Sequence, residues 1–392
     1  MACPVVSLRL LESNTSANLI VHGQGVFLFA TTQECSFTVS NKDNTAGLEV
    51  HLLRDSVEVS YRNTSLKLLD PTNSSGLTTI NGAYYWFSLD SHNQRLYVGV
   101  GEPRLETVIY RYSFPTNDSK SFLESLTTIS IPNSITPMKL LRDPVTLKTP
   151  LIVKDTNDLT MDDIANNLYL AKSYLSDNAQ KLYECISGKN FLLNDVNFPD
   201  FSNAIEYSIA TPGLWCNTKL KEKSTEFNKD VPNPTETYLR ITLGQNNGES
   251  PGISYVMEIW PVGHYSPIHS HSQANAVIRV LHGKIHVSLY PFLCAEKDGV
   301  DPFANHEFVK GNITWISPTL NQTHQLKNLS SSKETCITIQ CYMYDDDDVA
   351  HYDYFDYIDD NGKKEQYEPD SDMDFVAFKE LMKQEWNARP RS

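Results

Sequence analysis

Short runs in which apolar and polar residues alternate recur through the first part of the chain. Four of them lie at residues 26–30, 48–52, 57–61 and 95–99, and asparagine, serine and glycine residues separate them. Because successive side chains of a strand point to opposite faces, such alternation is typical of strands with one buried face. The spacing of the runs along residues 5–115 predicts a β-sandwich.

The second half of the chain contains two histidines one residue apart within a β pattern. His269 and His271 precede an apolar strand at residues 277–290, and His324 lies in a further strand-like stretch at 313–327. Residues i and i+2 of a strand share a face, so the first two imidazoles can reach one point. A returning strand can supply His324 as a third ligand. Three neutral imidazoles suit iron(II) and leave coordination positions open, so the pattern predicts a metal centre.

Helices are predicted before and after this β pattern. Thr160 and Asp163 form a capping-box pattern, which indicates the start of a helix that runs toward Cys185. Further helices are predicted near residues 202–209 and 375–386.

The length of the chain, 392 residues, indicates more than one domain, because single cores stop growing at roughly 250 residues. We predict a β-sandwich module at residues 1–118, a linker and helical segment at 119–200, and the metal-binding β domain at 201–392.

The formal net charge of −15 is concentrated near the C-terminus. Residues 345–374 hold 13 acidic and two basic side chains, with aromatic residues among them at 352–357. Such a surface disfavours a nucleic-acid partner. A run of like charge is usually a solvated loop or tail, but the interleaved aromatic residues indicate that part of it packs on the β domain.

Three features of the sequence predict a cytoplasmic protein without a membrane partner. No apolar run reaches the roughly 18 residues needed to cross a bilayer. The N-terminus lacks a basic segment followed by a long apolar one. The seven cysteines are irregularly spaced and contain no Cys-x-x-Cys, a pattern typical of reduced thiols.

The order of these histidines, with Gly263 before the pair and Gly283 at the following turn, resembles the two histidine motifs of the cupin superfamily. The resemblance implies a small antiparallel β-barrel of the jelly-roll type that holds a metal ion. The expected fold is therefore mainly β, with an N-terminal β-sandwich, a C-terminal cupin and a few flanking helices. The window 272–276 carries no carboxylate, so three histidines are favoured over three histidines and a glutamate.

Within the cupins, residues 200–357 resemble the thiol dioxygenases, in particular cysteine dioxygenase. The family's tyrosine-x-arginine pair looks similar to Tyr238 and Arg240, and its late catalytic strand to residues 338–342, which end at Tyr342. Five residues that precede the His269–His271 pair match the family in spacing: Trp260, Gly263, His264, Ser266 and Ile268.

The resemblance implies an iron(II) enzyme that adds both atoms of O2 to the sulfur of a small thiol and forms a sulfinic acid. Arg240 would hold the substrate carboxylate through a bidentate fork, and Tyr342 would offer its hydroxyl as a catalytic hydrogen-bonding group. Tyr238, Trp260 and Gln340 would line the substrate site.

Three positions depart from the family pattern. The cysteine that cross-links to the catalytic tyrosine in animal cysteine dioxygenases is Ala276 here, the histidine two residues before the tyrosine is Gln340, and the aspartate between the paired histidines is Ser270. An amide forms hydrogen bonds but does not change its charge near neutral pH. The substrate therefore stays open between cysteine and another thiol carboxylate such as 3-mercaptopropionate.

The stretch at residues 84–90, followed by 96–102, resembles the domain named after farnesoic acid O-methyltransferase. Gly99 and Gly101 alone make a weak signal for a methyl-donor site, because no strand-loop-helix fingerprint surrounds them. We expect a binding or assembly module whose ligand or protein partner the sequence does not identify. We also expect its aromatic cluster to form core.

Two other functions remain open for the C-terminal half. A cupin can use the same three histidines for oxygenation of another kind, isomerisation or hydrolysis. A degenerate cupin can serve as a non-enzymatic binding protein.

Overall fold

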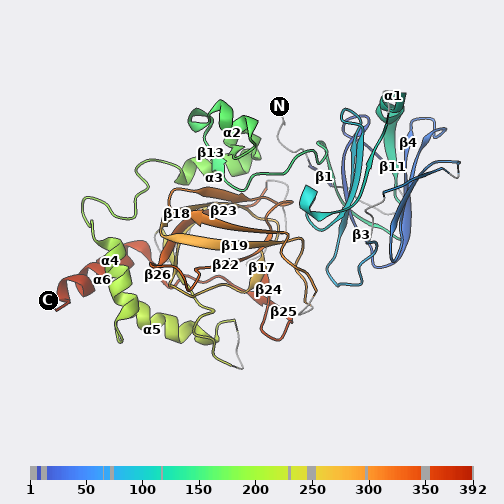
Figure 1. Cartoon of the computed structure of the whole chain (residues 1–392). Helices are drawn as coiled ribbons and strands as arrows, with labels where there is room; N and C mark the ends of the chain where they lie inside the picture. Colours follow the sequence, from blue (N-terminus) through green and yellow to red (C-terminus); the bar gives the residue numbers. More distant parts are fainter. Residues whose placement is uncertain are drawn as a thin grey trace. The chain divides into compact units, whose positions relative to one another are not determined.

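The computed structural model describes residues 7–9, 16–64, 66–70, 75–115, 118–227, 231–244, 253–295, 299–345 and 354–390. The chain divides into two compact units, and each contains two six-stranded sheets (Figure 1). The first unit is Met1–Thr149; the second comprises Pro150–Lys297 and Asp301–Ser392. The prediction of a mainly β protein with two β modules and a few helices is confirmed.

The first unit is a sandwich of two antiparallel sheets. One sheet has the order β1-β12-β3-β8-β9-β10 and the other β2-β11-β4-β5-β6-β7. The first sheet comprises β1 (Ser7–Arg9), β12 (Thr136–Leu141), β3 (Gln24–Ala30), β8 (Tyr85–Asp90), β9 (Arg95–Val100) and β10 (Val108–Ser113). The second comprises β2 (Ser16–Asn18), β11 (Leu126–Ser130), β4 (Cys35–Asn41), β5 (Gly47–Leu52), β6 (Val57–Tyr61) and β7 (Lys67–Leu68), with α1 (Asp118–Ser125) leading into β11.

Aromatic side chains fill the space between these two sheets. Phe37 of β4 makes edge-to-face contacts with Phe27 of β3 and Phe87 of β8, with ring centroids 5.5 Å apart in both pairs. These three side chains are at most 2% exposed. The aromatic cluster therefore forms core.

The close approach of Trp86 explains why residue 99 is a glycine. It lies opposite Trp86 in the β8–β9 register, and a Cβ atom at this position would lie 2.2 Å from the indole ring. The glycine therefore makes room for a fully buried tryptophan.

The boundary between the units differs from the predicted one at residue 118. β11 lies between β2 and β4, and β12 lies between β1 and β3. Residues 119–149 therefore complete the sandwich, and the second unit begins at Pro150.

The second unit contains two further six-stranded sheets. The first has the order β21-β18-β23-β16-β15-β26, and the second β20-β19-β22-β17-β24-β25. The first comprises β21 (Ile313–Ile316), β18 (Asn275–His282), β23 (Cys336–Met343), β16 (Ser254–Trp260), β15 (Leu239–Leu243) and β26 (Met373–Asp374). The second comprises β20 (Ala304–Val309), β19 (Lys284–Tyr290), β22 (Thr323–Lys327), β17 (Ile268–Ser270), β24 (Phe355–Ile358) and β25 (Lys364–Tyr367). All neighbours are antiparallel except β15 and β26.

The two sheets of the second unit share one core. Trp260 and Val280 of the first sheet join Val287 and Leu326 of the second in it. The chain passes from one sheet to the other at Gly283, which has a φ of +65° and would bring a Cβ atom within 2.6 Å of the Thr335 carbonyl oxygen. Only glycine meets both conditions without strain.

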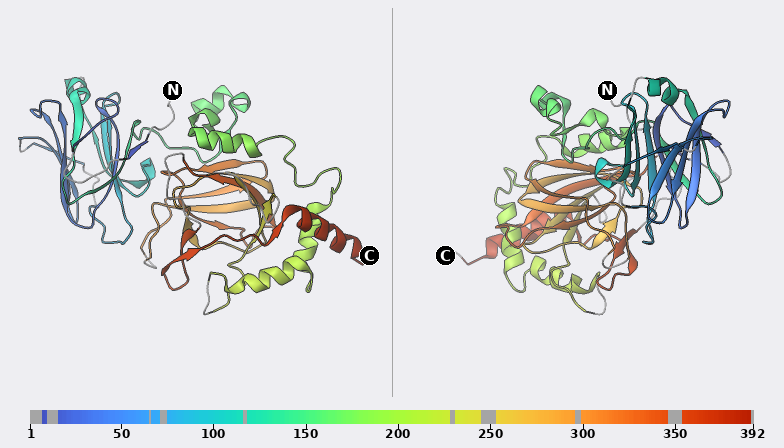
Figure 2. Two further views of the ribbon diagram at one scale, coloured as in Figure 1. Left: turned by 180° about the vertical axis from the view of Figure 1, so that it is seen from behind. Right: turned by 45° about the vertical axis from the view of Figure 1, so that its right-hand side comes forward.

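Helices cover the outer face of the first sheet (Figures 1 and 2). α3 (Asp177–Ile186) packs on β18 and β23, whereas α4 (Phe201–Ala210), α5 (Trp215–Glu222) and α6 (Phe375–Ala388) lie beside β15 and one another. The predicted helices at 202–209 and 375–386 correspond to α4 and α6. None of the helices in the described ranges is both long and apolar enough to cross a membrane.

The predicted continuous helix from Thr160 to Cys185 is wrong. The capping box of Thr160 and Asp163 forms, but α2 (Met161–Ala165) ends after one turn. Asn167 then adopts a φ of +50°, and the chain forms the short strand β14 (Leu170–Ala171), which pairs with β13 (Val153–Lys154) before α3 begins. A left-handed residue ends a helix, and asparagine accepts that conformation readily.

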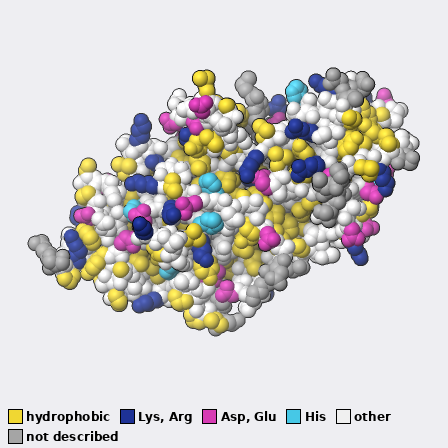
Figure 3. Space-filling view, viewed as in Figure 1, with side chains coloured by type: hydrophobic (Ala, Val, Ile, Leu, Met, Phe, Trp, Pro, Cys, Tyr) yellow, Lys and Arg dark blue, Asp and Glu magenta, His cyan; other side chains and the backbone are white. Residues whose placement is uncertain are grey.

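Part of the acidic segment packs on the second unit, as its aromatic residues indicate. β24 pairs with β17, and β25 pairs with β24. Residues 346–353, which include most of the initial aspartate run, lie outside the described residues. On the face seen in Figure 3, lysine and arginine side chains are scattered among acidic, polar and hydrophobic ones.

Candidate metal centre

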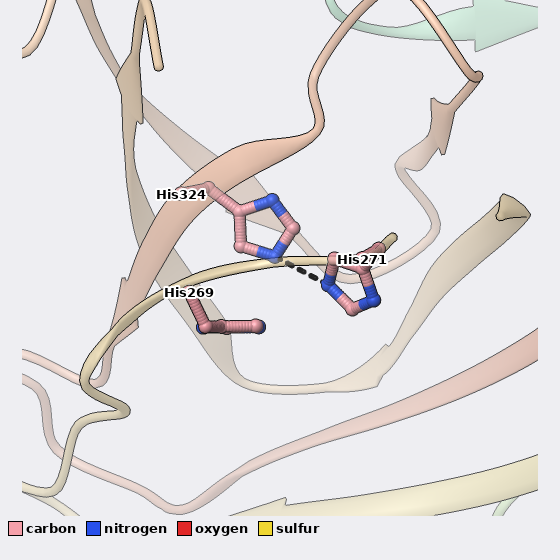
Figure 4. Close-up of side chains that lie close together, drawn as sticks. All are labelled: His269, His271 and His324. Carbon is pink, nitrogen blue, oxygen red and sulfur yellow. Dashed lines mark hydrogen bonds between the residues drawn. The ribbon is translucent and has the colours of Figure 1, made fainter. Parts of the chain in front are cut away.

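Three histidines from two neighbouring strands converge in the second unit (Figure 4). β17 carries His269 and leads directly into His271, and β22 carries His324. The antiparallel register of the two strands places His269 opposite His324. One ligand atom from each of the three side chains lies within 4.8 Å of the others. The strand periodicity predicted from the sequence thus brings the three imidazoles together.

Backbone carbonyls fix the tautomers of two of these histidines. Nδ1 of His269 lies 3.0 Å from the carbonyl oxygen of Pro267, and Nδ1 of His324 lies 3.1 Å from that of Asn321. A carbonyl oxygen only accepts hydrogen bonds, so each Nδ1 donates its proton. The Nε2 lone pairs of His269 and His324 are therefore free to bind a metal, an arrangement typical of metal-ligating histidines.

The spacing of one pair of ring nitrogens is that of two ligands of one metal ion. Nε2 of His271 lies 3.1 Å from Nε2 of His324. Two nitrogens that each lie about 2.1 Å from one ion, at an angle near 90°, are separated by about 3.0 Å. Nδ1 of His271 is buried and has no hydrogen-bond partner within the described parts of the chain.

Burial keeps the three imidazoles neutral. It lowers the pKa of His269 to about 4 and that of His324 to about 3, and it also lowers the pKa of His271 well below its usual 6.5. The neighbouring histidines add to this effect for His271 and His324. A neutral imidazole is the form that binds a metal ion, so the set is ready to ligate at neutral pH.

A cavity between the two sheets adjoins the three histidines. The space open to the centres of water molecules is about 60 Å³. One water needs roughly 10–15 Å³ by this measure, so the cavity fits a ligand of only a few heavy atoms. All eight residues selected from the sequence line it: Tyr238, Arg240, Trp260, His269, His271, His324, Gln340 and Tyr342.

Arg240 forms a buried ion pair in the cavity wall. Its Nη1 donates to Oε1 of Glu258 at 2.7 Å, and the two residues are 5% and 4% exposed. They face each other because the β15–β16 register pairs them directly. Nε of Arg240 is buried without a hydrogen-bond partner in the described structure. Burial raises the pKa of Glu258, and the neighbouring guanidinium opposes that rise.

Tyr342 and Gln340 lie on the same face of β23. The Tyr342 hydroxyl donates to Oε1 of Gln340 at 2.6 Å. The Tyr342 ring lies nearly parallel to the His271 imidazole, with centroids 5.8 Å apart. Burial raises the pKa of Tyr342, and the carboxylate of Glu258 adds to the rise. The phenol therefore stays protonated and acts as a hydrogen-bond donor.

Tyr238 and Trp260 form a rigid part of the wall. Their rings stack with centroids 4.1 Å apart and an interplanar angle of 17°. Both are buried, and Nε1 of Trp260 has no hydrogen-bond partner among the residues described.

Several lining residues were not selected from the sequence. Glu258 is one, and its only signal is a carboxylate two residues before Trp260, on the same strand face. Three more come from the acidic segment: Phe355, Tyr357 and Tyr367 also line the cavity. Tyr357 lies opposite His269 in the β17–β24 register. The alternation of aromatic and acidic residues there is the signal that these side chains point inward.

Apolar side chains form much of the remaining cavity wall. Ile278, Val280, Ile285, Val287 and Leu289 line it together with the polar residues already named. A small ligand there would meet three imidazoles, a cation paired with a carboxylate, and a phenol, surrounded by apolar side chains.

No protein-family model matches the chain. Among solved structures, it is similar to the cupin domain of Cnp3 from Schizosaccharomyces pombe, at 16% identity and a TM-score of 0.22, over 28% of this chain and 65% of that one. A Cupin_2 domain of an XRE family transcriptional regulator from Enterobacter cloacae matches at 15% identity and a TM-score of 0.21, over 28% of this chain and 97% of that one.

DMSP lyase DddQ from Ruegeria pomeroyi DSS-3 is a third similar structure, at 14% identity and a TM-score of 0.22, over 33% of this chain and 56% of that one. The chain thus spans less than two thirds of the Cnp3 and DddQ chains. These TM-scores are low, and the fold is defined by the sheet order and strand register given above.

Proposed function

We propose that the second unit is a cupin that holds one iron(II) ion and oxidises a small thiol with O2 to its sulfinic acid. One observation carries the proposal. The three histidines of the predicted metal centre and five residues chosen by resemblance to the thiol dioxygenases, spread from Tyr238 to Tyr342 in the sequence, line one cavity. The three histidines are neutral imidazoles whose ligand atoms lie within 4.8 Å of one another.

The position of Ala276 supports the same reading. The family resemblance places its cross-linking cysteine at this residue, next to the catalytic tyrosine. In the structure Ala276 lies directly opposite Tyr342 in the β18–β23 register. The strand register thus places Tyr342 beside the position that the resemblance gives to the cross-linked cysteine, which supports its proposed role.

His269, His271 and His324 would hold the ion. A bound iron(II) supplies redox chemistry and open coordination positions for a thiol and O2. The reaction adds both oxygen atoms to one sulfur, so RSH and O2 give RSO2H. The Tyr342 ring lies beside His271, and its hydroxyl, which donates to Gln340, would rearrange to offer its proton to the bound thiol or O2.

The remaining residues position the substrate. Arg240 offers its unpartnered Nε to a carboxylate, and the stack of Tyr238 on Trp260 forms a wall that keeps water out. The cavity has room for a small thiol such as cysteine or 3-mercaptopropionate. The proposed role of the first unit is that of a binding or assembly module.

Oxygen consumption tests the proposal. The protein is loaded with iron without oxygen and then mixed with O2 and cysteine, 3-mercaptopropionate or cysteamine, and the product is identified by mass. We expect thiol-dependent uptake and the matching sulfinate. His286→Ala, on β19 of the same unit, is the matched control for removal of a histidine outside the metal site.

Two results would contradict it. Protein that holds iron but consumes no oxygen with any thiol would indicate another cupin reaction. Protein that does not retain iron, and whose stability does not change with chelators, would indicate a binding protein.

A further inference from the structure

The cavity wall carries one cation and one carboxylate, and they are paired. Arg240 and Glu258 are the only Arg, Lys, Asp or Glu side chains among the described residues that line the cavity. Their ion pair is 2.7 Å long, and each side chain is 6% exposed. With the histidines neutral, the wall itself has no net charge.

The pair does not meet all the hydrogen-bonding capacity of Arg240. Its Nη1 contacts Glu258, whereas its Nε is buried and without a partner in the described residues. The acidic group nearest to the Arg240 backbone, Asp372, accepts from the backbone N–H at 2.7 Å and pairs with Lys223 at 3.1 Å. Asp372 therefore does not compete for the guanidinium.

A ligand carboxylate that reaches Arg240 must come close to the carboxylate of Glu258. Two carboxylates beside one guanidinium repel each other in a site with little water. An ammonium group on the same ligand removes the conflict, because it can pair with Glu258 while the ligand carboxylate pairs with Arg240. A buried charge left without a partner is costly, so this complementarity selects strongly among small ligands.

We propose that Glu258 and Arg240 together recognise a zwitterionic amino-carboxylate, so that the substrate is an α-amino acid thiol such as cysteine and Glu258 determines this choice. The inference rests on the proposed function and specifies its substrate class. Glu258 acts as a specificity-determining residue, since it binds the amine and takes no part in the change at sulfur.

A purely structural role explains the pair less well. Buried ion pairs add little stability compared with apolar residues of similar size. This pair also lines a cavity, and Nε of Arg240 has no partner in the described residues, whereas a structural pair would be fully bonded.

Binding without oxygen tests the inference apart from catalysis. L-cysteine, 3-mercaptopropionate and cysteamine are titrated into the iron-loaded protein by calorimetry in an anaerobic chamber. The wild type should bind cysteine more tightly than either thiol with a single charged group. Thermal shifts of the metal-free protein should give the same ranking, because the recognition pair belongs to the chain.

Glu258→Gln keeps the shape of the side chain and removes its charge. We expect the affinity for cysteine to fall by at least about tenfold and that for 3-mercaptopropionate to rise, so that the preference reverses. Glu307→Gln is the matched control, since it breaks the surface pair with Lys284 on the same unit. It should leave all three affinities unchanged.

The inference fails if the wild type prefers 3-mercaptopropionate, or if Glu258→Gln changes all three affinities by one factor. Should this variant not fold, the Arg240→Gln/Glu258→Gln protein, which has neither charge, should show no preference for cysteine. Retention of the preference there would also overturn the inference. Failure of the proposed function appears separately, as ligand binding without sulfinate formation once oxygen is admitted.

Discussion

The two units build the same arrangement of two six-stranded sheets but use the space between the sheets in opposite ways. In the first unit, Phe27, Phe29 and Phe37 fill it, with ring centroids 5.2–5.5 Å apart. In the second unit, the corresponding space holds a cavity with three histidines and a buried ion pair.

This difference supports the second unit as the part of the molecule that carries the proposed chemistry. Buried polar groups cost free energy unless they are paired, and a filled apolar core avoids that cost. The second unit nevertheless leaves Nδ1 of His271, Nε of Arg240 and Nε1 of Trp260 buried and unpartnered within the described structure. Such groups, gathered at one cavity, are typical of a ligand site.

Removal of one proposed metal ligand should have the largest effect on the second unit. His324→Ala should reduce the iron that co-purifies with the protein to background, because two imidazoles from one short strand do not complete the site. Metal analysis of the purified protein measures this. A variant that still holds stoichiometric iron would show that the third ligand is another residue.

A cavity created in the first unit should have the reverse effect. Phe37→Ala removes a ring from the centre of the sandwich and should lower the free energy of unfolding by about 3–5 kcal/mol. Urea unfolding measures the loss, and the iron content of the folded protein should not change. Loss of iron in this variant would contradict the proposal that only the second unit holds the metal.

Acid should weaken the metal-free second unit. The pKa values of His269 and His324 in the folded state are about 4 and 3, below the ordinary 6.5. Unfolded chains therefore bind more protons between these values, so the contribution to stability is complete above about pH 6.5 and is lost as the pH falls toward 4. We expect a loss on the order of 1–3 kcal/mol between pH 7 and pH 5, measured by urea unfolding.

His324→Gln should reduce this pH dependence, because it removes one of the depressed pKa values. An unfolding free energy that stays constant from pH 7 to pH 5 would contradict the neutral, buried state of the histidines.

The smallest effect concerns the geometry of Arg240. Arg240→Lys keeps the charge but loses the planar fork, so KM for cysteine should rise by about tenfold, and KM for cysteamine, which has no carboxylate, much less. Steady-state oxygen uptake measures both. Equal changes for the two thiols would contradict a contact between Arg240 and the substrate carboxylate.

Local patterns in the sequence predicted the elements that local interactions specify. Alternation located β3, β5, β6 and β9, and the i, i+2 spacing placed His269 and His271 at one point. The Asp374 cap on Ala377 likewise begins α6 where an apolar helical pattern starts.

Features that depend on distant pairing could not be predicted in this way. β11 becomes a central strand only by pairing with β4, about 90 residues earlier, so its own short sequence did not reveal the domain boundary. Glu258 meets Arg240 through the register of two strands, and Tyr357 reaches His269 through the return of the acidic segment. Asn167 ended a helix whose apolar spacing continued beyond it.

The position of β24 and β25 has a consequence for the order in which the site is built. A chain made from its N-terminus acquires His269, His271 and His324 before Phe355, Tyr357 and Tyr367, which form the last part of the cavity wall. During synthesis the three ligands therefore exist while one side of the site is still missing. A metal ion of the proposed kind could therefore reach the three histidines before the acidic segment adds its part of the wall.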